Sequence, residues 1–190
     1  IEIELPTIIR MERSSGGVQA IKNAADLLSN AKFPVILSGA GVILADAIND
    51  CKALAEKLDA PVACGYQHND SFPGSHPLAV GPLGYNGSKA AMEIISKADV
   101  VLALGTRLNP FSTLPCYGID YWPKKASIIQ VDINSDRLGL AKKIQIGICG
   151  DAKLVAKQIL EQLPSNAGDI NRDDRKAIIH QIKSSWLQTL

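Results

Sequence analysis

The sequence predicts an open, doubly wound α/β fold, with a parallel sheet of five or six strands and helices on both faces. Short apolar runs alternate along the chain with amphipathic stretches of helical period, which is typical of β-α-β units. The runs consist almost wholly of Val, Ile, Leu and Ala, as they must when helices bury both faces of a strand. Glycine or aspartate follows several of the runs directly.

The N-terminal half predicts two helices and two strands. Residues 17–30 carry apolar side chains on one helical face, and residues 34–38 (PVILS) form an apolar run of strand length. Residues 45–58 repeat the helical pattern, and residues 61–64 form a second short strand. This alternation begins the expected sheet.

A long loop interrupts the alternation between Cys64 and Gly87. It contains five glycines, three prolines and two histidines, and long irregular segments are either binding loops or disordered. Apolar Leu78, Val80 and Leu83 recur between its turn residues, so we expect it to be packed.

The C-terminal half restores the pattern. Helical periodicity covers residues 88–97 and 152–163. A segment with three prolines, residues 108–125, predicts turns. The apolar runs of strand length cover residues 100–104, 127–131 and 144–148.

Both ends of the chain differ from this pattern. The chain starts at Ile1 with IEIELP, and we expect residues 1–16 to be a linker from a missing N-terminal domain. Residues 17–165 form the expected central domain. Residues 166–190 predict a polar linker and a helix over 177–190, with Trp186 on its apolar stripe. This helix either connects to a missing C-terminal domain or packs on the same domain.

The composition limits the class of protein. With 190 residues, 46% hydrophobic and 21% charged, the chain is typical of a globular protein. A net charge of +1 with scattered basic residues argues against a nucleic-acid partner. No apolar run is long enough to span a membrane. Its cysteines lack metal-type spacing and predict buried, reduced thiols of a cytoplasmic protein, at Cys51, Cys64, Cys116 and Cys149.

Ligands of such sheets bind beyond the carboxyl ends of the strands, where the strand order reverses. Gly39 and Gly41 follow the first strand and either present backbone amides to a phosphate or simply permit a tight turn. A full dinucleotide fingerprint is not present, because its third position is Leu44 and no acidic residue ends the second strand. An ordinary nicotinamide dehydrogenase is therefore not expected.

Three further strand ends carry polar residues. Asp132 is placed to bind ribose hydroxyls or to cap the turn that follows, and we weigh these roles equally. Arg107 is suited to a phosphate or to an ion pair, of which we favour the ion pair. Asp151 is expected first as a helix N-cap and second as a ligand contact.

Histidines in the long loop raise the question of a metal site. His68 and Asp70 are two residues apart, His76 precedes a proline, and no other ligand lies close in the sequence. We therefore expect no metal site. No nucleophile elbow or Ser–His–Asp pattern is visible either, so no catalytic residue is predicted.

Five motifs in order carry a resemblance over about residues 1–165: PVILSGAGV, FPGSHPLAVGPLGYNG, ADVVLALGTRLN, IIQVDIN and GDAK. Together they resemble the central domain of thiamine-diphosphate enzymes of the acetolactate synthase and pyruvate oxidase type. The long loop and the GIDYWP segment look most like the sulfoacetaldehyde acetyltransferase branch of that family.

The resemblance implies a Rossmann-like domain of a cytoplasmic enzyme of taurine and sulfonate breakdown, which converts sulfoacetaldehyde and phosphate to acetyl phosphate and sulfite. It implies that thiamine diphosphate and Mg²⁺ are bound by missing pyrimidine- and pyrophosphate-binding domains. The parent would be a homo-oligomer, and this chain alone would be inactive.

In flavin-containing members of the family this domain holds FAD along the strand ends; in others it holds ADP or nothing. The residues that match by motif position are Gly39, Gly41, Arg107, Asp132, Ile133 and Asp151. Residues 108–110 (LNP) depart from the more polar, acidic run of acetolactate synthases. We therefore interpret the nucleotide site as vestigial or structural.

Two alternative functions remain open from the sequence. One is a free-standing FAD- or ADP-binding module of the electron-transfer-flavoprotein type, which shares this architecture. The other is an NAD-dependent deacylase or synthase domain, which the missing ribose acid and zinc module disfavour.

Overall fold

A single six-stranded parallel sheet forms the centre of the protein in the computed structural model, which describes residues 12–189. Its strands lie in the order β3-β2-β1-β4-β5-β6. The order reverses between β1 and β4, which confirms the predicted doubly wound topology. The strands are β1 (Pro34–Ser38), β2 (Val62–Cys64), β3 (Ala79–Pro82), β4 (Val100–Leu104), β5 (Ser127–Asp132) and β6 (Ile146–Cys149).

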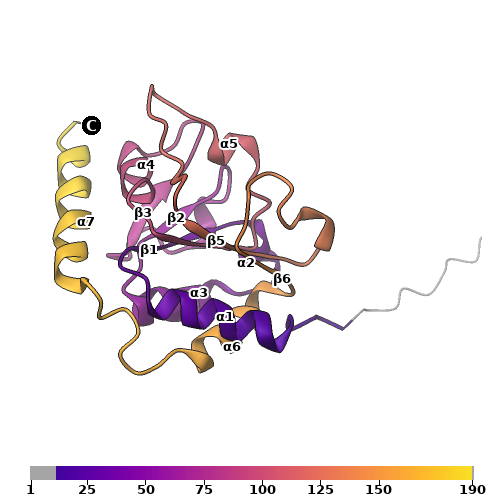
Figure 1. Cartoon of the computed structure of the whole chain (residues 1–190). Helices are drawn as coiled ribbons and strands as arrows, with labels where there is room; N and C mark the ends of the chain where they lie inside the picture. The colour runs from indigo at the N-terminus through magenta and orange to yellow at the C-terminus, as the bar shows by residue number, and fades with distance from the viewer. Residues whose placement is uncertain (1–11, 190) are drawn as a thin grey trace, which may run out of the picture.

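Helices cover both faces of the sheet (Figure 1). On one face lie α1 (Val18–Ser29), α3 (Ile48–Leu58) and α6 (Ala152–Gln162), whose apolar sides share one buried cluster. The other face is covered by α4 (Lys89–Ile95) and α7 (Arg172–Leu187). The short helix α2 (Ala40–Leu44) follows β1 directly, and the short helix α5 (Pro110–Thr113) follows β4 after residues 105–109.

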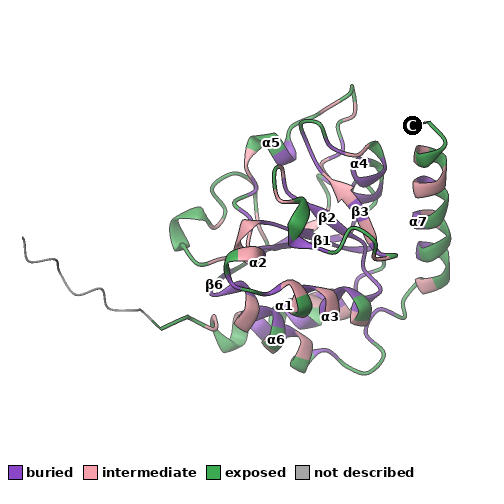
Figure 2. Cartoon of the chain, turned by 180° about the vertical axis from the view of Figure 1, so that it is seen from behind, coloured by how far each residue is buried: buried purple, intermediate pink, exposed green. Residues whose placement is uncertain are grey.

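The central strands are buried on both faces, as their continuous apolar sequence predicts. All residues of β1 and β4 are buried (Figure 2). Ile36 and Leu102 lie in register and face the α1, α3 and α6 side, whereas Val35 and Val101 face the α4 and α7 side. Strand alternation therefore builds two cores from one sheet.

The predicted helix over 45–58 is wrong at its start. The structure forms α2 immediately after β1 and then breaks the chain before α3 begins at Ile48. Asp46 lies in the left-handed region with φ 54°, a conformation that an α-helix does not accommodate. The prediction therefore missed the short helix α2 altogether and began the second helix at residue 45, ahead of its observed start at Ile48.

The long loop from Cys64 to Gly87 is not irregular throughout, contrary to the prediction. It contains the edge strand β3, which pairs in parallel with β2, with a shift of register between Val62 and Ala63. Gly81 (φ 95°) and Pro82 obscured this strand in the sequence, and both residues are tolerated at a sheet edge. The loop is packed, as expected, because Leu78, Val80 and Leu83 are buried.

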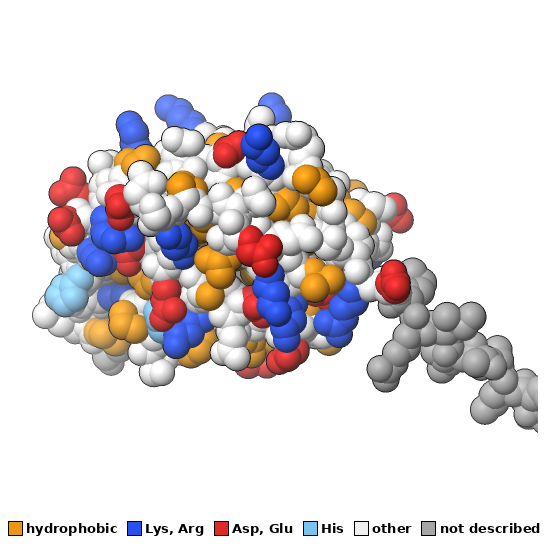
Figure 3. All heavy atoms as spheres, turned by 90° about the horizontal axis from the view of Figure 1, so that it is seen from below, with side chains coloured by type: hydrophobic (Ala, Val, Ile, Leu, Met, Phe, Trp, Pro, Cys, Tyr) orange, Lys and Arg blue, Asp and Glu red, His pale blue; other side chains and the backbone are white. Residues whose placement is uncertain are grey.

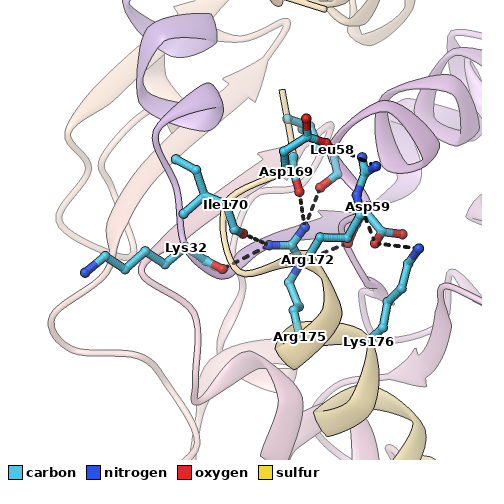
Figure 4. A network of polar contacts seen from close by, with 9 residues as sticks. Lys32, Leu58, Asp59, Asp169, Ile170, Arg172, Arg175 and Lys176 are labelled. Carbon is cyan, nitrogen blue, oxygen red and sulfur yellow. Dashed lines mark hydrogen bonds and ion pairs between the residues drawn. The ribbon is translucent and has the colours of Figure 1, made fainter. Parts of the chain in front are cut away.

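The C-terminal helix begins five residues earlier than predicted, inside the segment interpreted as a polar linker. Arg175 lies in its first turns and is only 1% exposed. Its guanidinium donates to the carbonyl oxygens of Asp59, Leu58 and Gly168 at 3.1, 3.1 and 2.7 Å (Figure 4). It also donates to the carbonyls of Lys32 and Ile170 at 3.0 and 2.8 Å.

These five hydrogen bonds, here called the Arg175 network, fix the segment before α7 against the ends of α1 and α3. Beyond them, α7 packs on α4, with Ile179 and Ile182 buried and Trp186 half-buried. The domain boundaries and the connector role of this helix stay predictions, and the predicted linker over residues 1–16 lies largely outside the described residues.

The cysteine prediction is correct for two of the four thiols. Cys51 and Cys64 are buried, and desolvation raises the pKa of Cys51 to about 12 and also raises that of Cys64. Cys116 is half-buried, and Cys149 is exposed because it ends the edge strand β6. No helix among the described residues is long and apolar enough to cross a membrane.

Candidate functional site

A cleft of about 420 Å³ opens at the carboxyl edge of the sheet, beyond β1, β4, β5 and β6. Five of the six predicted site residues line it: Gly41, Arg107, Asp132, Ile133 and Asp151. The sixth, Gly39, precedes α2 and does not line the cleft. We call this the strand-end cleft; its other lining residues are Arg13, Ala40, Leu44, Ala45, Gly150 and Ala152.

The two glycines permit a close crossing of backbones. A Cβ on Gly39 would lie 2.6 Å from the carbonyl oxygen of Gly105, and one on Gly41 would lie 2.6 Å from the Gly105 Cα. Gly105 itself has φ 61°, which favours glycine. The N–H of Gly41 donates to the Gly105 carbonyl at 2.8 Å. These contacts give both glycines a structural role.

Asp151 fulfils the expected capping role. Its carboxylate accepts from the N–H groups of Lys153 and Leu154 at 3.0 and 3.2 Å, at the start of α6. The same carboxylate pairs with the guanidinium of Arg13 at 3.4 Å and is buried. Its negative charge at a helix N-terminus is favourable.

Asp132 also serves the turn that follows its strand. Its Oδ1 accepts from the N–H of Asn134 at 2.9 Å, and Asn134 in turn accepts from the N–H of Asp136. Asp132 is half-buried and lines the strand-end cleft. The cap interpretation of this residue is therefore observed, and its ligand role stays a prediction.

Two arginines border the cleft in different ways. Arg107 is exposed, and within residues 12–189 it makes no hydrogen bond or ion pair, so the favoured ion pair is not found there. Arg13 pairs with Asp151 and donates to the carbonyl of Ala45 at 3.3 Å. Sequence reasoning missed Arg13, because it precedes the first helix and reaches the cleft only through the folded chain.

An ion pair at the rim joins α6 to the turn between α2 and α3. Nζ of Lys153 donates to Asp46 at 2.8 Å. This hydrogen bond lowers the pKa of Asp46 and raises that of Lys153, because each charge stabilises the other. Both groups lie at the surface, so the pair orders the rim more than it stabilises the fold.

The cleft fits a nucleotide only in part. Arg107 offers a free guanidinium fork to an anion, and Leu44 and Ile133 offer apolar side chains that are 81% and 69% exposed. A pyrophosphate on the glycine turn does not fit, because the Gly41 N–H is already bonded and α2 has only five residues.

The loop histidines lie away from this cleft. His76 Nδ1 accepts from the N–H of Leu78 at 3.2 Å, and Nε2 lies 3.2 Å from a carboxylate oxygen of Glu56. His76 lines a separate groove of about 610 Å³ between α3, α7 and the turn at Pro77. In the part of the chain that the structure describes, no three His, Cys, Asp or Glu side chains are grouped as metal ligands.

Comparison with protein families identifies one that covers most of the chain. The family described as thiamine pyrophosphate enzyme, central domain, matches residues 21–162. That range runs from α1 to the end of α6 and contains the whole sheet.

Similar proteins extend over the full length of the chain. "Probable sulfoacetaldehyde acetyltransferase" of Rhizobium meliloti is 72% identical over 190 residues, and sulfoacetaldehyde acetyltransferase of Roseovarius nubinhibens is 69% identical over 190 residues. Both matches cover 100% of this chain and 32% of the relative. The acetolactate synthase large subunit of Buchnera aphidicola is 37% identical over 153 residues, which are 80% of this chain and 26% of that protein. The chain thus spans about a third of the length of the curated relatives it matches.

Proposed function

Because the chain belongs to the thiamine pyrophosphate enzyme central-domain family, we propose that it is the central domain of a thiamine-diphosphate-dependent sulfoacetaldehyde acetyltransferase. The parent reaction converts sulfoacetaldehyde and phosphate to acetyl phosphate and sulfite, in taurine and sulfonate breakdown. The observation that carries this proposal is the unbroken match of all 190 residues at 72% and 69% identity. Acetolactate synthases match at lower identity and over less of the chain.

The role of this chain in the parent enzyme is that of a scaffold. The relatives are about three times as long, so their remaining length provides room for the pyrimidine- and pyrophosphate-binding domains that hold thiamine diphosphate and Mg²⁺. The cofactor supplies carbanion chemistry when it is bound there. The described residues contribute a rigid parallel sheet that positions its neighbours.

The finer features of this proposal concern the whole enzyme. We place it in the cytoplasm as a homo-oligomer. A free-standing flavin or ADP module is not favoured, because the chain aligns from end to end with one third of longer acetyltransferases.

The strand-end cleft has a structural role in this proposal. Its glycines are explained by the crossing of α2 over Gly105, and its buried carboxylate is explained by the N-cap of α6. The nucleotide positions Gly39, Gly41, Arg107, Asp132, Ile133 and Asp151 are thus a remnant of a site that other family members use. Neither FAD nor ADP is required for the proposed reaction.

An activity assay tests the proposal. The full-length protein that contains this chain is incubated with sulfoacetaldehyde, phosphate, thiamine diphosphate and MgCl₂, and acetyl phosphate and sulfite are measured separately. We expect both products in equal amounts from the full-length protein and neither from residues 1–190 alone. Acetyl phosphate formed by the isolated chain would overturn the scaffold role. In a parallel assay with pyruvate in place of sulfoacetaldehyde, acetolactate formed by a full-length protein that releases no sulfite from sulfoacetaldehyde would overturn the substrate.

A further inference from the structure

Two segments of the chain lack charged residues: one contains β3 with its flanking turns, and the other follows β4. Residues 71–88 and 108–119 contain no Asp, Glu, Lys or Arg, although such residues make up 21% of the chain. By contrast, the face over α1, α3 and α6 mixes basic and acidic side chains, as a solvated surface does (Figure 3). Protein surfaces that become the centre of an interface are depleted in charge and enriched in aromatic residues.

Three aromatic rings form a cluster, here called the aromatic cluster. Tyr85 and Phe111 belong to the two uncharged segments, and Tyr66 precedes the first of them. The rings of Tyr66 and Phe111 stack with centroids 5.4 Å apart, and Tyr85 meets Tyr66 edge-on at 6.2 Å. Tyr85 is 57% exposed and Phe111 is 61% exposed. Large aromatic side chains are thus held against one another and still face water.

The backbone under the cluster is fixed by hydrogen bonds and close packing. The N–H of Tyr66 donates to Oγ of Ser112 at 2.8 Å, and the N–H of Tyr85 donates to the carbonyl of Phe111 at 3.0 Å. The buried Tyr121 donates its hydroxyl to the Ser112 carbonyl at 3.0 Å. Gly84, with φ 82°, lies so close to Phe111 that a Cβ would overlap its carbonyl oxygen. A surface fixed in this way loses little entropy when a partner binds.

We propose that the aromatic cluster, together with the uncharged loops 83–88 and 108–119 at the carboxyl edge of the sheet, is the surface on which another domain of the same parent polypeptide docks. The proposal rests on the proposed function, since it takes its partner from the two thirds of the relatives that lie outside this chain. Its partner is a largely apolar protein surface, because the loops themselves carry no charged side chain. Two lysines lie against loop 108–119 and already have partners there: Lys89 Nζ is 5.5 Å from the centroid of the Tyr117 ring, and Lys142 Nζ is 3.5 Å from the Thr113 carbonyl oxygen.

The size of the cluster favours a covalently linked domain over a second copy of this chain. A stable contact between separate molecules buries about 800 Å² per partner. Three partly exposed rings supply about half of that, since a fully buried aromatic side chain contributes about 150–250 Å². Linkage in one polypeptide raises the effective concentration to about the millimolar range, at which a small apolar contact suffices.

Hydroxyl-radical footprinting tests the surface without substrate. The oxidation of Tyr85 and Phe111 is compared between residues 1–190 and the full-length protein that contains them. We expect these side chains to be oxidised about five-fold more slowly in the full-length protein, because an interface core excludes water. Leu140 and Val18, which are 68% and 85% exposed on other parts of the surface, are internal controls with unchanged rates.

Two results would overturn the proposal. Equal oxidation of Tyr85 and Phe111 in both proteins would show that no domain covers them. Protection that appears in the isolated chain as its concentration rises would assign the surface to a second copy instead. Protection in a full-length protein that fails to form acetyl phosphate would uphold the docking surface and reject the proposed reaction, so the two failures are distinguishable.

Paired substitutions provide a second readout. In the full-length protein, we expect Phe111→Ser to lower the Tm by about 3 °C or more and Leu140→Ser to leave it within about 1 °C. In residues 1–190, Leu140→Ser should stay within about 1 °C. Phe111→Ser should lower the Tm there by less than in the full-length protein, because only its stacking on Tyr66 is lost. An equal, small shift for the two variants in the full-length protein would contradict the docking role of Phe111.

Discussion

Arg175 and Arg107 are arginines in contrasting surroundings. Arg175 is 1% exposed and donates to five main-chain carbonyls from three separate parts of the chain. Arg107 is exposed on the wall of the strand-end cleft and has no partner within residues 12–189. The first guanidinium uses all of its donors inside the fold, and the second leaves its planar fork to the solvent or to a partner.

The difference separates a structural arginine from one that is available for recognition. Burial lowers the pKa of Arg175, since desolvation disfavours its charge, and the carbonyl dipoles of the Arg175 network compensate for that cost. Gly168 allows close packing in the same region. Its backbone is in the left-handed region (φ 84°) and lies directly against the backbone of Leu58, where a side chain would not fit. Among residues 12–189, no carbonyl groups converge on Arg107 in this way.

The largest expected effect is at Arg175. Arg175→Ala leaves the carbonyls of Leu58, Asp59 and Gly168 buried without donors, so we expect the free energy of unfolding to fall by about 3 kcal/mol or more. Urea denaturation followed by circular dichroism measures it. Arg172→Ala, on the same helix, removes ion pairs with Asp169 and with the largely buried Asp59 at 3.1 and 3.6 Å. Because Lys176 still pairs with Asp59 at 3.3 Å, we expect this variant to cost only about 1 kcal/mol. Similar losses for both variants would mean that the buried Arg175 network stabilises the fold no more than the ion pairs of Arg172 do.

A smaller effect is expected at the base of the cleft. Gly41→Ala would place a Cβ 2.6 Å from the Cα of Gly105, and because backbone cannot yield as a side chain does, we expect a loss of about 2 kcal/mol. Gly74→Ala is the matched control, since nothing lies within 4 Å of its Cβ position, and it should stay within about 0.5 kcal/mol. A neutral Gly41→Ala variant would mean that the crossing of α2 over Gly105 is loose.

Substitutions of Asp151 test how much its role as the N-cap of α6 contributes to stability. Asp151→Ala removes the acceptor for two N–H groups of α6, and we expect it to cost about 1–2 kcal/mol in thermal or urea unfolding. Asp151→Asn retains an acceptor but loses the ion pair with the half-exposed Arg13 and the favourable charge at the N-terminus of α6, so it should cost about 0.5–1 kcal/mol. Equal costs for the two variants would show that charge, rather than the cap, is what matters.

The smallest effect is expected at Arg107. Arg107→Ala removes an exposed side chain without a described partner, so the free energy of unfolding should change by less than about 0.5 kcal/mol. Calorimetric titration with ADP should give no binding below about 1 mM for either protein, because the glycine turn offers no free amide at Gly41. Sub-millimolar ADP binding that depends on Arg107 would instead show an active nucleotide site.

The fold was predictable where each strand carries its own signal. The apolar runs of β1 and β4 were predicted with their observed bounds, because burial on both faces leaves Ser38, at the end of β1, as their single polar residue. β3 was missed because its pattern is broken by Gly81 and Pro82, residues that an edge strand tolerates and a central one does not. The start of α7 was missed because its first turns are as polar as a linker.

The candidate site was predictable as a place but not as a set of contacts. Parallel strands end at one edge, so Arg107, Asp132 and Asp151 had to lie near one another. The sequence did not show that Arg13 reaches the same cleft, nor that the N–H of Gly41 is already bonded. Both facts depend on segments that are far apart along the chain.

The sequence by itself determined the parallel sheet apart from β3, the side of the sheet where the cleft lies and the family, because these follow from local periodicity and short motifs. The tertiary structure alone decided which polar groups are satisfied. Arg175 looks like any exposed linker residue in the sequence, and it is structural only because carbonyls at Lys32, Leu58 and Gly168 converge on it in space. Whether a donor is satisfied depends on contacts between distant segments, which no local pattern encodes.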